Sequence, residues 1–95
     1  MKKIIILIPV FNDWDSLKKL IYEINESIKD IDNIDFECLI VNDSSTIEQP
    51  QLSRPKNIKT LKILNMKENK GHARCNAFGI RYVFKKKEFD NLILM

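Results

Sequence analysis

The sequence predicts an α/β fold, in which helices pack on a mostly parallel β-sheet, and two patterns carry this prediction. Short, almost uninterrupted apolar runs occur at residues 3–8, where the residues are largely β-branched, and at residues 36–41. Such runs are typical of strands that are buried on both faces of a sheet. Between them lies a segment with apolar residues at spacings of three and four, which is the pattern of an amphipathic helix. A helix that connects two buried strands implies a right-handed crossover and therefore parallel strands.

The first strand and the first helix are separated by a short polar turn. Proline cannot donate a hydrogen bond within a sheet, so we expect Pro9 to end the strand. A helix is expected over residues 15–29, and several residues are candidates for its N-cap: Asn12, Asp13, Asp15 and Ser16. The apolar face of this helix should consist of Leu17, Leu20, Ile21, Ile24, Ile28 and Ile31.

The second half of the chain predicts a loop, two strands and one helix. Residues 46–59 contain two prolines and show no periodicity, so they should form a loop. A strand over residues 59–64 and a polar turn over residues 65–70 follow. The next helix is expected over residues 71–84, and its inner face should carry Ala73, Ala77, Ile80 and Phe84.

The fourth strand begins at residues 91–95 and has no helix after it to cover its apolar side chains. The predicted order is strand, helix, strand, strand, helix, strand. Residues 1–95 are enough for one domain at most. We therefore expect an incomplete domain that is truncated after the fourth strand.

The charge of the chain is too small to indicate a polyanionic partner. The formal charge is +3, from 16 basic and 13 acidic residues, so no nucleic-acid partner is expected. The one basic run, residues 85–87, suits the end of a helix; the alternative is a contact with phosphate or lipid.

The cysteines and the hydropathy pattern predict a cytoplasmic protein. Cys38 and Cys75 are far apart and lack any disulfide-framework spacing, and a single histidine is too few for a zinc site with them. Reduced, buried thiols are the simplest interpretation. No apolar stretch is long enough for a signal peptide or a membrane span.

Polar residues follow each of the first three predicted strands, at Asn12-Asp13, Asn42-Asp43 and residues 69–71. Parallel sheets bind ligands beyond the carboxyl ends of their strands, so these residues should converge on one edge. With only two glycines in the chain, neither a GxGxxG motif nor a phosphate-binding P-loop is present.

The first two stretches have both a functional and a structural interpretation. Phe11 can pack near a nucleotide base and Asn12 can bond to it, or the stretch is a plain strand-to-helix turn. Asp43 can accept hydrogen bonds from a base or a ribose hydroxyl, or it can shape an Asx turn.

The third stretch combines two cations with a helix start. Lys70 and Arg74 lie four residues apart where helical N–H groups favour anions. Arg74 can bind a phosphate in bidentate fashion; alternatively, it pairs with Asp13 or Asp43.

Taken together, the stretches IILIPVFND, LIVNDSS, NKGHARCNAFGI and NLILM resemble a known family pattern. The chain is similar to the N-terminal part of family 2 glycosyltransferases, which have the Rossmann-like GT-A fold. Their pattern opens with "ilIPvyNe", continues with "vvDDgS" and "N.G.a.ArN.G", and ends in a strand that leads to an acidic DxD motif. Asn42 departs from this pattern, because the family often has a second aspartate there.

The resemblance implies a nucleotide site at the sheet edge. Its residues would be Pro9, Val10, Phe11 and Asn12 around the base, Asp43 at the base or ribose, and Lys70, Gly71 and Arg74 by the base and the diphosphate. It also implies transfer of a sugar from a nucleotide-sugar, most commonly a UDP-sugar, to an acceptor, with inversion and with Mg²⁺ or Mn²⁺ on the diphosphate. The acidic metal-binding motif is expected just after Met95. No catalytic or metal-binding residue is therefore expected within residues 1–95, which should bind nucleotide without transferring sugar.

Two other classes of protein remain open. One is a non-catalytic α/β module that binds nucleotides. The other is an interaction domain that self-associates through its exposed last strand. For a longer protein, association with the cytoplasmic face of a membrane is a further expectation from the resemblance.

Overall fold

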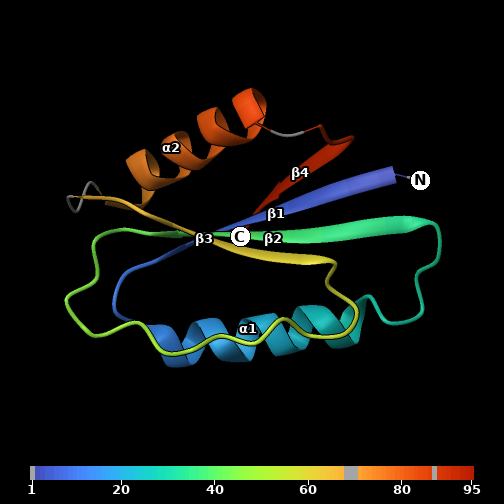
Figure 1. Ribbon diagram of the computed structural model, residues 1–95, viewed down its shortest axis with the longest axis horizontal. Helices are drawn as coiled ribbons and strands as arrows, with labels where there is room; N and C mark the ends of the chain where they lie inside the picture. The colour runs from blue at the N-terminus through green and yellow to red at the C-terminus, as the bar shows by residue number, and fades with distance from the viewer. Residues whose placement is uncertain (1, 68–70, 87) are drawn as a thin grey trace.

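The computed structural model describes residues 2–67, 71–86 and 88–95 and confirms the predicted α/β fold. The elements are β1 (Lys2–Val10), α1 (Trp14–Ser27), β2 (Ile34–Asn42), β3 (Thr60–Asn65), α2 (Gly71–Lys86) and β4 (Asn91–Leu94). The four strands are parallel and lie in the order β3-β2-β1-β4. Helix α1 covers one face of this sheet and α2 the other (Figure 1).

Strand β1 continues through Pro9 to Val10, so the prediction that Pro9 ends the strand is wrong. Parallel strands bond to their two neighbours with alternate residues. The carbonyl of Val10 accepts from Asp43 of the β2 side, and the carbonyl of Leu7 accepts from Met95 of the β4 side. Pro9 therefore faces the β4 side, where pairing with β1 stops at Leu7. The missing N–H of Pro9 removes no sheet hydrogen bond.

The core consists of two layers, one on each face of the sheet. Alternate residues of β1 point to opposite faces: Ile6 and Ile8 pack against α1, while Ile5 and Leu7 lie in the layer under α2. Most of the predicted inner face of α1 is buried, namely Leu17, Ile21, Ile24 and Ile28. Ile31 is an exception, because the helix ends at Ser27 and leaves this side chain 45% exposed.

The predicted inner face of α2 is partly wrong. Among the described residues of α2, Cys75, Gly79 and Val83 are buried, whereas Phe84 is 68% exposed. The predicted Ala73 lies outside the described side chains. Gly79 explains the difference, because a Cβ atom there would lie 2.6 Å from Cδ1 of Leu7. Helix α2 thus packs closely against the sheet at Gly79.

The long connection between β2 and β3 runs alongside α1, as Figure 1 shows. It is attached to α1 by three hydrogen bonds. The Nε1 of the buried Trp14 donates to the carbonyl of Ile47, and Asn57 bonds through its backbone N–H and its side chain to Asn25. Ile58, at the end of the connection, is fully buried. The segment is a loop, as predicted, but a packed one.

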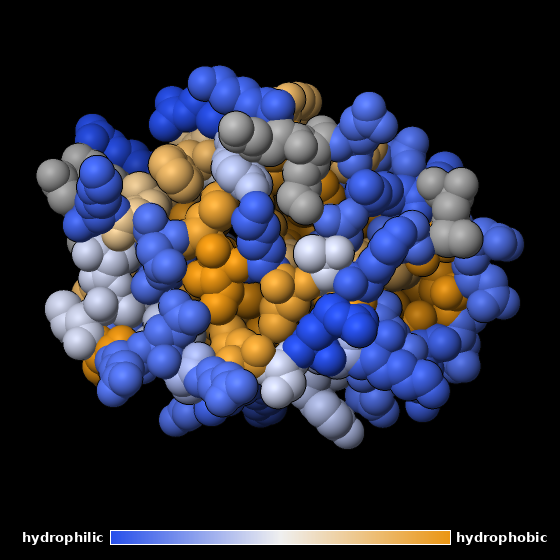
Figure 2. Space-filling view, in the orientation of Figure 1, coloured by the Kyte–Doolittle hydropathy of each residue, from blue (hydrophilic) through white to orange (hydrophobic). Residues whose placement is uncertain are grey.

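Both edges of the sheet carry partly exposed apolar side chains. Ile63 and Leu64 of β3 are half-buried, and Ile93 and Leu94 of β4 are 42% and 51% exposed. Figure 2 shows hydrophobic atoms gathered between the two helices, with hydrophilic atoms around them. Within the described ranges, no helix is both long enough and apolar enough to cross a bilayer.

Candidate functional site

Asp43 connects three elements at the carboxyl edge of the sheet. It directly follows β2, and its backbone N–H donates to the carbonyl of Val10 at the end of β1, at 2.8 Å. Its Oδ2 accepts from the backbone N–H of Gly71, the first residue of α2, at 2.9 Å. The Asp43 side chain is only 1% exposed. The ends of β1 and β2 and the start of α2 are thus brought together, as predicted.

The carboxylate of Asp43 lies where a helix favours negative charge. The first N–H groups of a helix have no partner within the helix, and their dipoles attract anions. Gly71 has φ +81°, a conformation that costs little only without a side chain. The glycine therefore allows the sharp entry into α2 that directs its N–H at Asp43.

Asn42 forms a polar network beside Asp43. Its Oδ1 accepts from the backbone N–H and the hydroxyl of Ser45, at 3.0 and 2.6 Å, and its Nδ2 donates to Oδ1 of Asn65 at 2.9 Å. A carboxylate at this position could accept from Ser45 but could not donate to Asn65. The asparagine that departs from the family pattern therefore has a structural use: it links the ends of β2 and β3.

Asn12 ties the turn after β1 to the loop after β2. Its Oδ1 accepts from the backbone N–H groups of Thr46 and Ile47 at 2.7 and 2.8 Å, and its Nδ2 donates to the Thr46 hydroxyl at 3.1 Å. The Asn12 backbone N–H donates to the Ser45 hydroxyl at 2.8 Å. The φ angle of Asn12 is +63°, which asparagine tolerates better than most residues. The side chain predicted to face a base thus already has its oxygen occupied by the protein.

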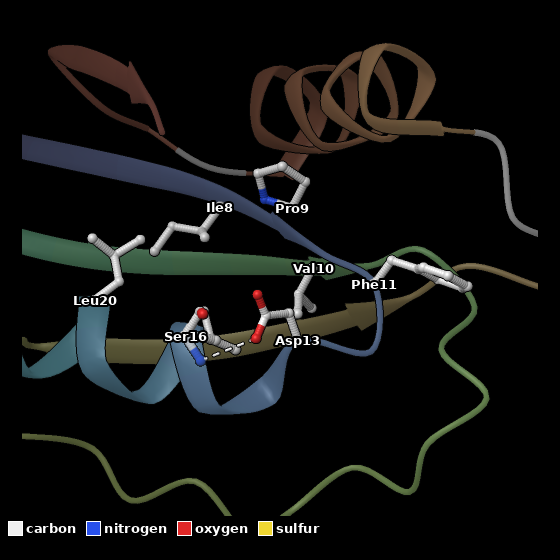
Figure 3. Close-up of a pocket in the computed structure, with 8 residues that line it drawn as sticks. Ile8, Pro9, Val10, Phe11, Asp13, Ser16 and Leu20 are labelled. Carbon is white, nitrogen blue, oxygen red and sulfur yellow. Dashed lines mark hydrogen bonds between the residues drawn. The ribbon is translucent and has the colours of Figure 1, made fainter.

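A pocket of about 310 Å³ lies where β1 ends and α1 begins (Figure 3). Three of the predicted site residues, Pro9, Val10 and Phe11, line it together with the first turns of α1. Asp13, which caps α1 by accepting from the N–H of Ser16, lies at its polar side. In Figure 3 the Phe11 ring extends away from Ile8 and Leu20, and it is 39% exposed. The ring is therefore accessible to a flat ligand.

Arg74 lines a second hollow, on the α2 side of the sheet. This hollow measures about 430 Å³ and is lined by Met66, Arg74, Ala77, Phe78 and Arg81. The Arg74 side chain is exposed, and within the described ranges it forms no ion pair with Asp13 or Asp43. Lys70, the other predicted cation, lies outside the described residues. The predicted residues therefore converge on one edge but divide between hollows on opposite faces.

Both cysteines are buried and free, as predicted. The thiol of Cys75 donates to the carbonyl of Val41 at 3.4 Å. Burial, and then the negative charge of Asp43, raises its pKa to about 11, and burial alone raises the pKa of Cys38 to about 11. Since the thiolate is the reactive form, neither cysteine is suited to nucleophilic chemistry at neutral pH.

The described residues contain no preformed cluster of metal-ligand side chains. Across residues 2–67, 71–86 and 88–95, no three or more histidine, cysteine, aspartate or glutamate side chains come together as metal ligands.

Sequence reasoning missed some of the residues that build this edge. Ser45 and Thr46 hold Asn12 and Asn42 in place, and Trp14 fixes the following loop. The polar run that begins at Asn42 in the sequence could have indicated Ser45 and Thr46. Nothing local marked Trp14, because its bonding partner is 33 residues away.

The fold and the site define a class of protein: an α/β domain that gathers polar groups at the carboxyl edge of a parallel sheet. The family model described as Glycosyl transferase family 2 matches residues 5–87, and the chain belongs to this family. Searches of curated proteins and of solved structures find no match. Members of this family generally use nucleotide-sugar donors, often with a divalent metal.

Proposed function

We propose that this protein transfers a sugar from a nucleotide-diphosphate sugar to an acceptor, and that residues 1–95 bind the donor nucleotide. The observation that supports this most directly is the position of Asp43. It bonds to the end of β1 and to the start of α2, so the three motif stretches share one edge of the sheet. Ligands of open parallel sheets bind at this edge.

Within this proposal, each exposed residue has a distinct role. The accessible ring of Phe11 packs against the base, with Pro9 and Val10 behind it. Arg74, in the first turn of α2, binds the diphosphate, where the helix dipole adds to its charge. The family pattern assigns Lys70 to the same part of the nucleotide as Arg74. Because Asp43 is buried, its contact with the base or ribose requires the side chain to become accessible when the nucleotide binds.

The proposed chemistry is a single displacement with inversion. An acceptor oxygen attacks the anomeric carbon while the bond from that carbon to the diphosphate breaks, and the nucleoside diphosphate leaves. A carboxylate takes the proton of the acceptor. The family pattern puts the acidic motif after the strand that corresponds to β4, so we propose that residues 1–95 alone bind the donor but do not transfer sugar.

Calorimetric titration of residues 1–95 with UDP, GDP and AMP tests donor binding. We expect saturable binding of one diphosphate, with UDP the first candidate. Arg74→Ala should weaken it about 10-fold or more, since a hydrogen bond to a charged group contributes about 1.5–3 kcal/mol. Lys85→Ala removes an exposed cation from the far end of the same helix and should leave the affinity unchanged. Equal effects of the two substitutions would count against the assigned site.

Incubation of residues 1–95 with nucleotide-sugars tests the absence of transfer. We expect neither sugar transfer nor release of nucleoside diphosphate above the background rate. Transfer by this chain would show that the catalytic groups lie within it and would overturn that part of the proposal.

We also propose a cytoplasmic location, because both thiols are free and buried. Fractionation of expressing cells checks it: recovery outside the cytoplasm would contradict this location.

A further inference from the structure

The charges of this chain are strongly segregated along the sequence. Residues 1–48 contain 5 basic and 10 acidic residues, whereas residues 49–87 contain 11 basic residues and 1 acidic residue. The second range forms most of the β2–β3 connection, β3 and α2, and the first forms β1, α1 and β2. The small net charge therefore hides an acidic first half and a basic second half of the chain.

The basic half contains the hollow that Arg74 lines. Phe78 lies in it between Arg74 and Arg81 on one face of α2, with Met66 beside them. Phe78 is 37% exposed, and both arginines are exposed. The two arginines are seven residues apart, or about 10 Å along the helix axis. Within the described ranges, neither forms an ion pair.

The acidic half contains a turn with the opposite pattern. Ile31 is 45% exposed and lies between Asp30 and Asp32, both exposed, in the turn between α1 and β2. The turn is fixed by two backbone hydrogen bonds: Ile31 N–H donates to the Ile28 carbonyl, and Lys2 N–H donates to the Asn33 carbonyl. In the described part of the chain, neither aspartate has an ion pair.

We propose that the Asp30–Ile31–Asp32 turn of one copy docks into the Arg74–Phe78–Arg81 hollow of a second copy. An exposed apolar side chain between two anions meets an exposed aromatic ring between two cations. Two aspartates one residue apart span at most about 7 Å of chain, and the long arginine side chains can bend toward them. The fixed turn needs little ordering on docking, which lowers the cost of association.

The two surfaces cannot meet within one copy. The turn follows α1, and the hollow lies on α2, on the other face of the sheet (Figure 1). Different surfaces of the two copies therefore meet, and each further copy can add in the same way. The contact is small and charged, so the association should be weak and should disappear at high salt.

Light scattering and sedimentation velocity test the proposal on residues 1–95, from micromolar to millimolar concentration. The average mass should rise with concentration and return to that of the monomer at high salt. Arg81→Glu, which alters the hollow, should abolish the rise, and so should Asp30→Lys/Asp32→Lys, which alters the turn. All three residues are exposed, so circular dichroism should show folded proteins.

A mixture of the two variants gives the sharpest result. One variant keeps an intact turn and the other an intact hollow, so the mixture should associate although neither variant does so alone. A monomeric wild type at millimolar concentration would overturn the proposal. Association that is lost only when β4 is altered, for example by Ile93→Lys, would overturn it in favour of strand pairing. Binding of a strictly monomeric wild type to anionic vesicles, lost in Arg81→Glu, would instead assign the hollow to lipid.

Discussion

Single residues at the sheet determine how closely α2 packs and how the site is held. Gly79 is the clearest case, because the space beside it is occupied by Leu7 and Val41. A Cβ atom on Gly79 would lie only 3.0 Å from Cγ2 of Val41. The absence of a side chain thus sets the distance between helix and sheet. The sequence shows a glycine within a helical pattern, but only the packing shows what it contacts.

Replacing Gly79 with valine should therefore destabilise the protein by about 1–3 kcal/mol, the usual cost of overfilling a packed core. Urea unfolding measures this. Ala77→Val is the matched control, because it places the same β-branched side chain at a half-buried position of the same helix. Its cost should stay below about 1 kcal/mol. Similar losses for both variants would mean that a β-branched side chain anywhere on α2, not contact with Leu7, causes the loss.

The buried thiols predict a loss of stability at alkaline pH. The ordinary thiol pKa is 9.0, and burial raises it to about 11 in the folded protein for both cysteines. As the pH rises, the thiols therefore lose their protons in the unfolded chain before they do so in the folded protein. The stability that the protonated thiols contribute to the folded protein is fully present below pH 9 and is lost as the pH rises to about 11.

Urea unfolding at a series of pH values checks this. The unfolding midpoint should fall across that range, and the fall should be smaller in Cys38→Ala/Cys75→Ala. An identical fall in that variant would show that other groups cause it.

At the scale of elements, the loop after β2 depends on Asn12. The side chain accepts two backbone N–H groups of this loop, and its positive φ is part of the same turn. Asn12→Gly keeps that backbone conformation but removes the side chain. Asn12→Ala removes the side chain and adds the left-handed strain, which costs about 1–2 kcal/mol.

Hydrogen exchange should show faster exchange of the Thr46 and Ile47 amides in both variants, with Asn12→Ala the less stable. Unchanged exchange in both would mean that Trp14 and Asn57 alone hold the loop. This measurement does not depend on any nucleotide.

Elements were predictable where a pattern within the element decides them. The apolar runs of β1 and β2 and the spacing in α1 predicted their type and approximate bounds. The errors occurred where contacts across the fold decide. Pro9 stays in β1 because it lies beyond Leu7, the last residue of β1 that pairs with β4, and Phe84 is exposed because Gly79 and Val83 occupy the interface.

At the scale of the whole molecule, topology predicted which residues meet, but not how their side chains bond. The parallel order brings Val10, Asp43 and Gly71 to one edge, as the sequence indicated. The buried position of Asp43 and the bonds of Asn12 depend on partners tens of residues away. No local pattern specifies such partners.

The molecule also has two sheet edges, an acidic turn and a hollow lined by arginines, which give it different routes to association. Strand pairing through β4 would bury its exposed Ile93, and docking of the acidic turn would bury Phe78 instead. Salt separates the two routes, because backbone pairing is insensitive to charge screening.

The most direct test of donor binding is nuclear magnetic resonance mapping of the backbone amides during titration with UDP. We predict saturable shifts at the carboxyl edge, at Phe11, Ser44 and Arg74, and none at the opposite ends of the strands, at Lys3, Asp35 and Asn91. Shifts confined to that opposite edge, or no shifts from UDP, GDP or AMP in a folded protein, would contradict the proposed nucleotide site.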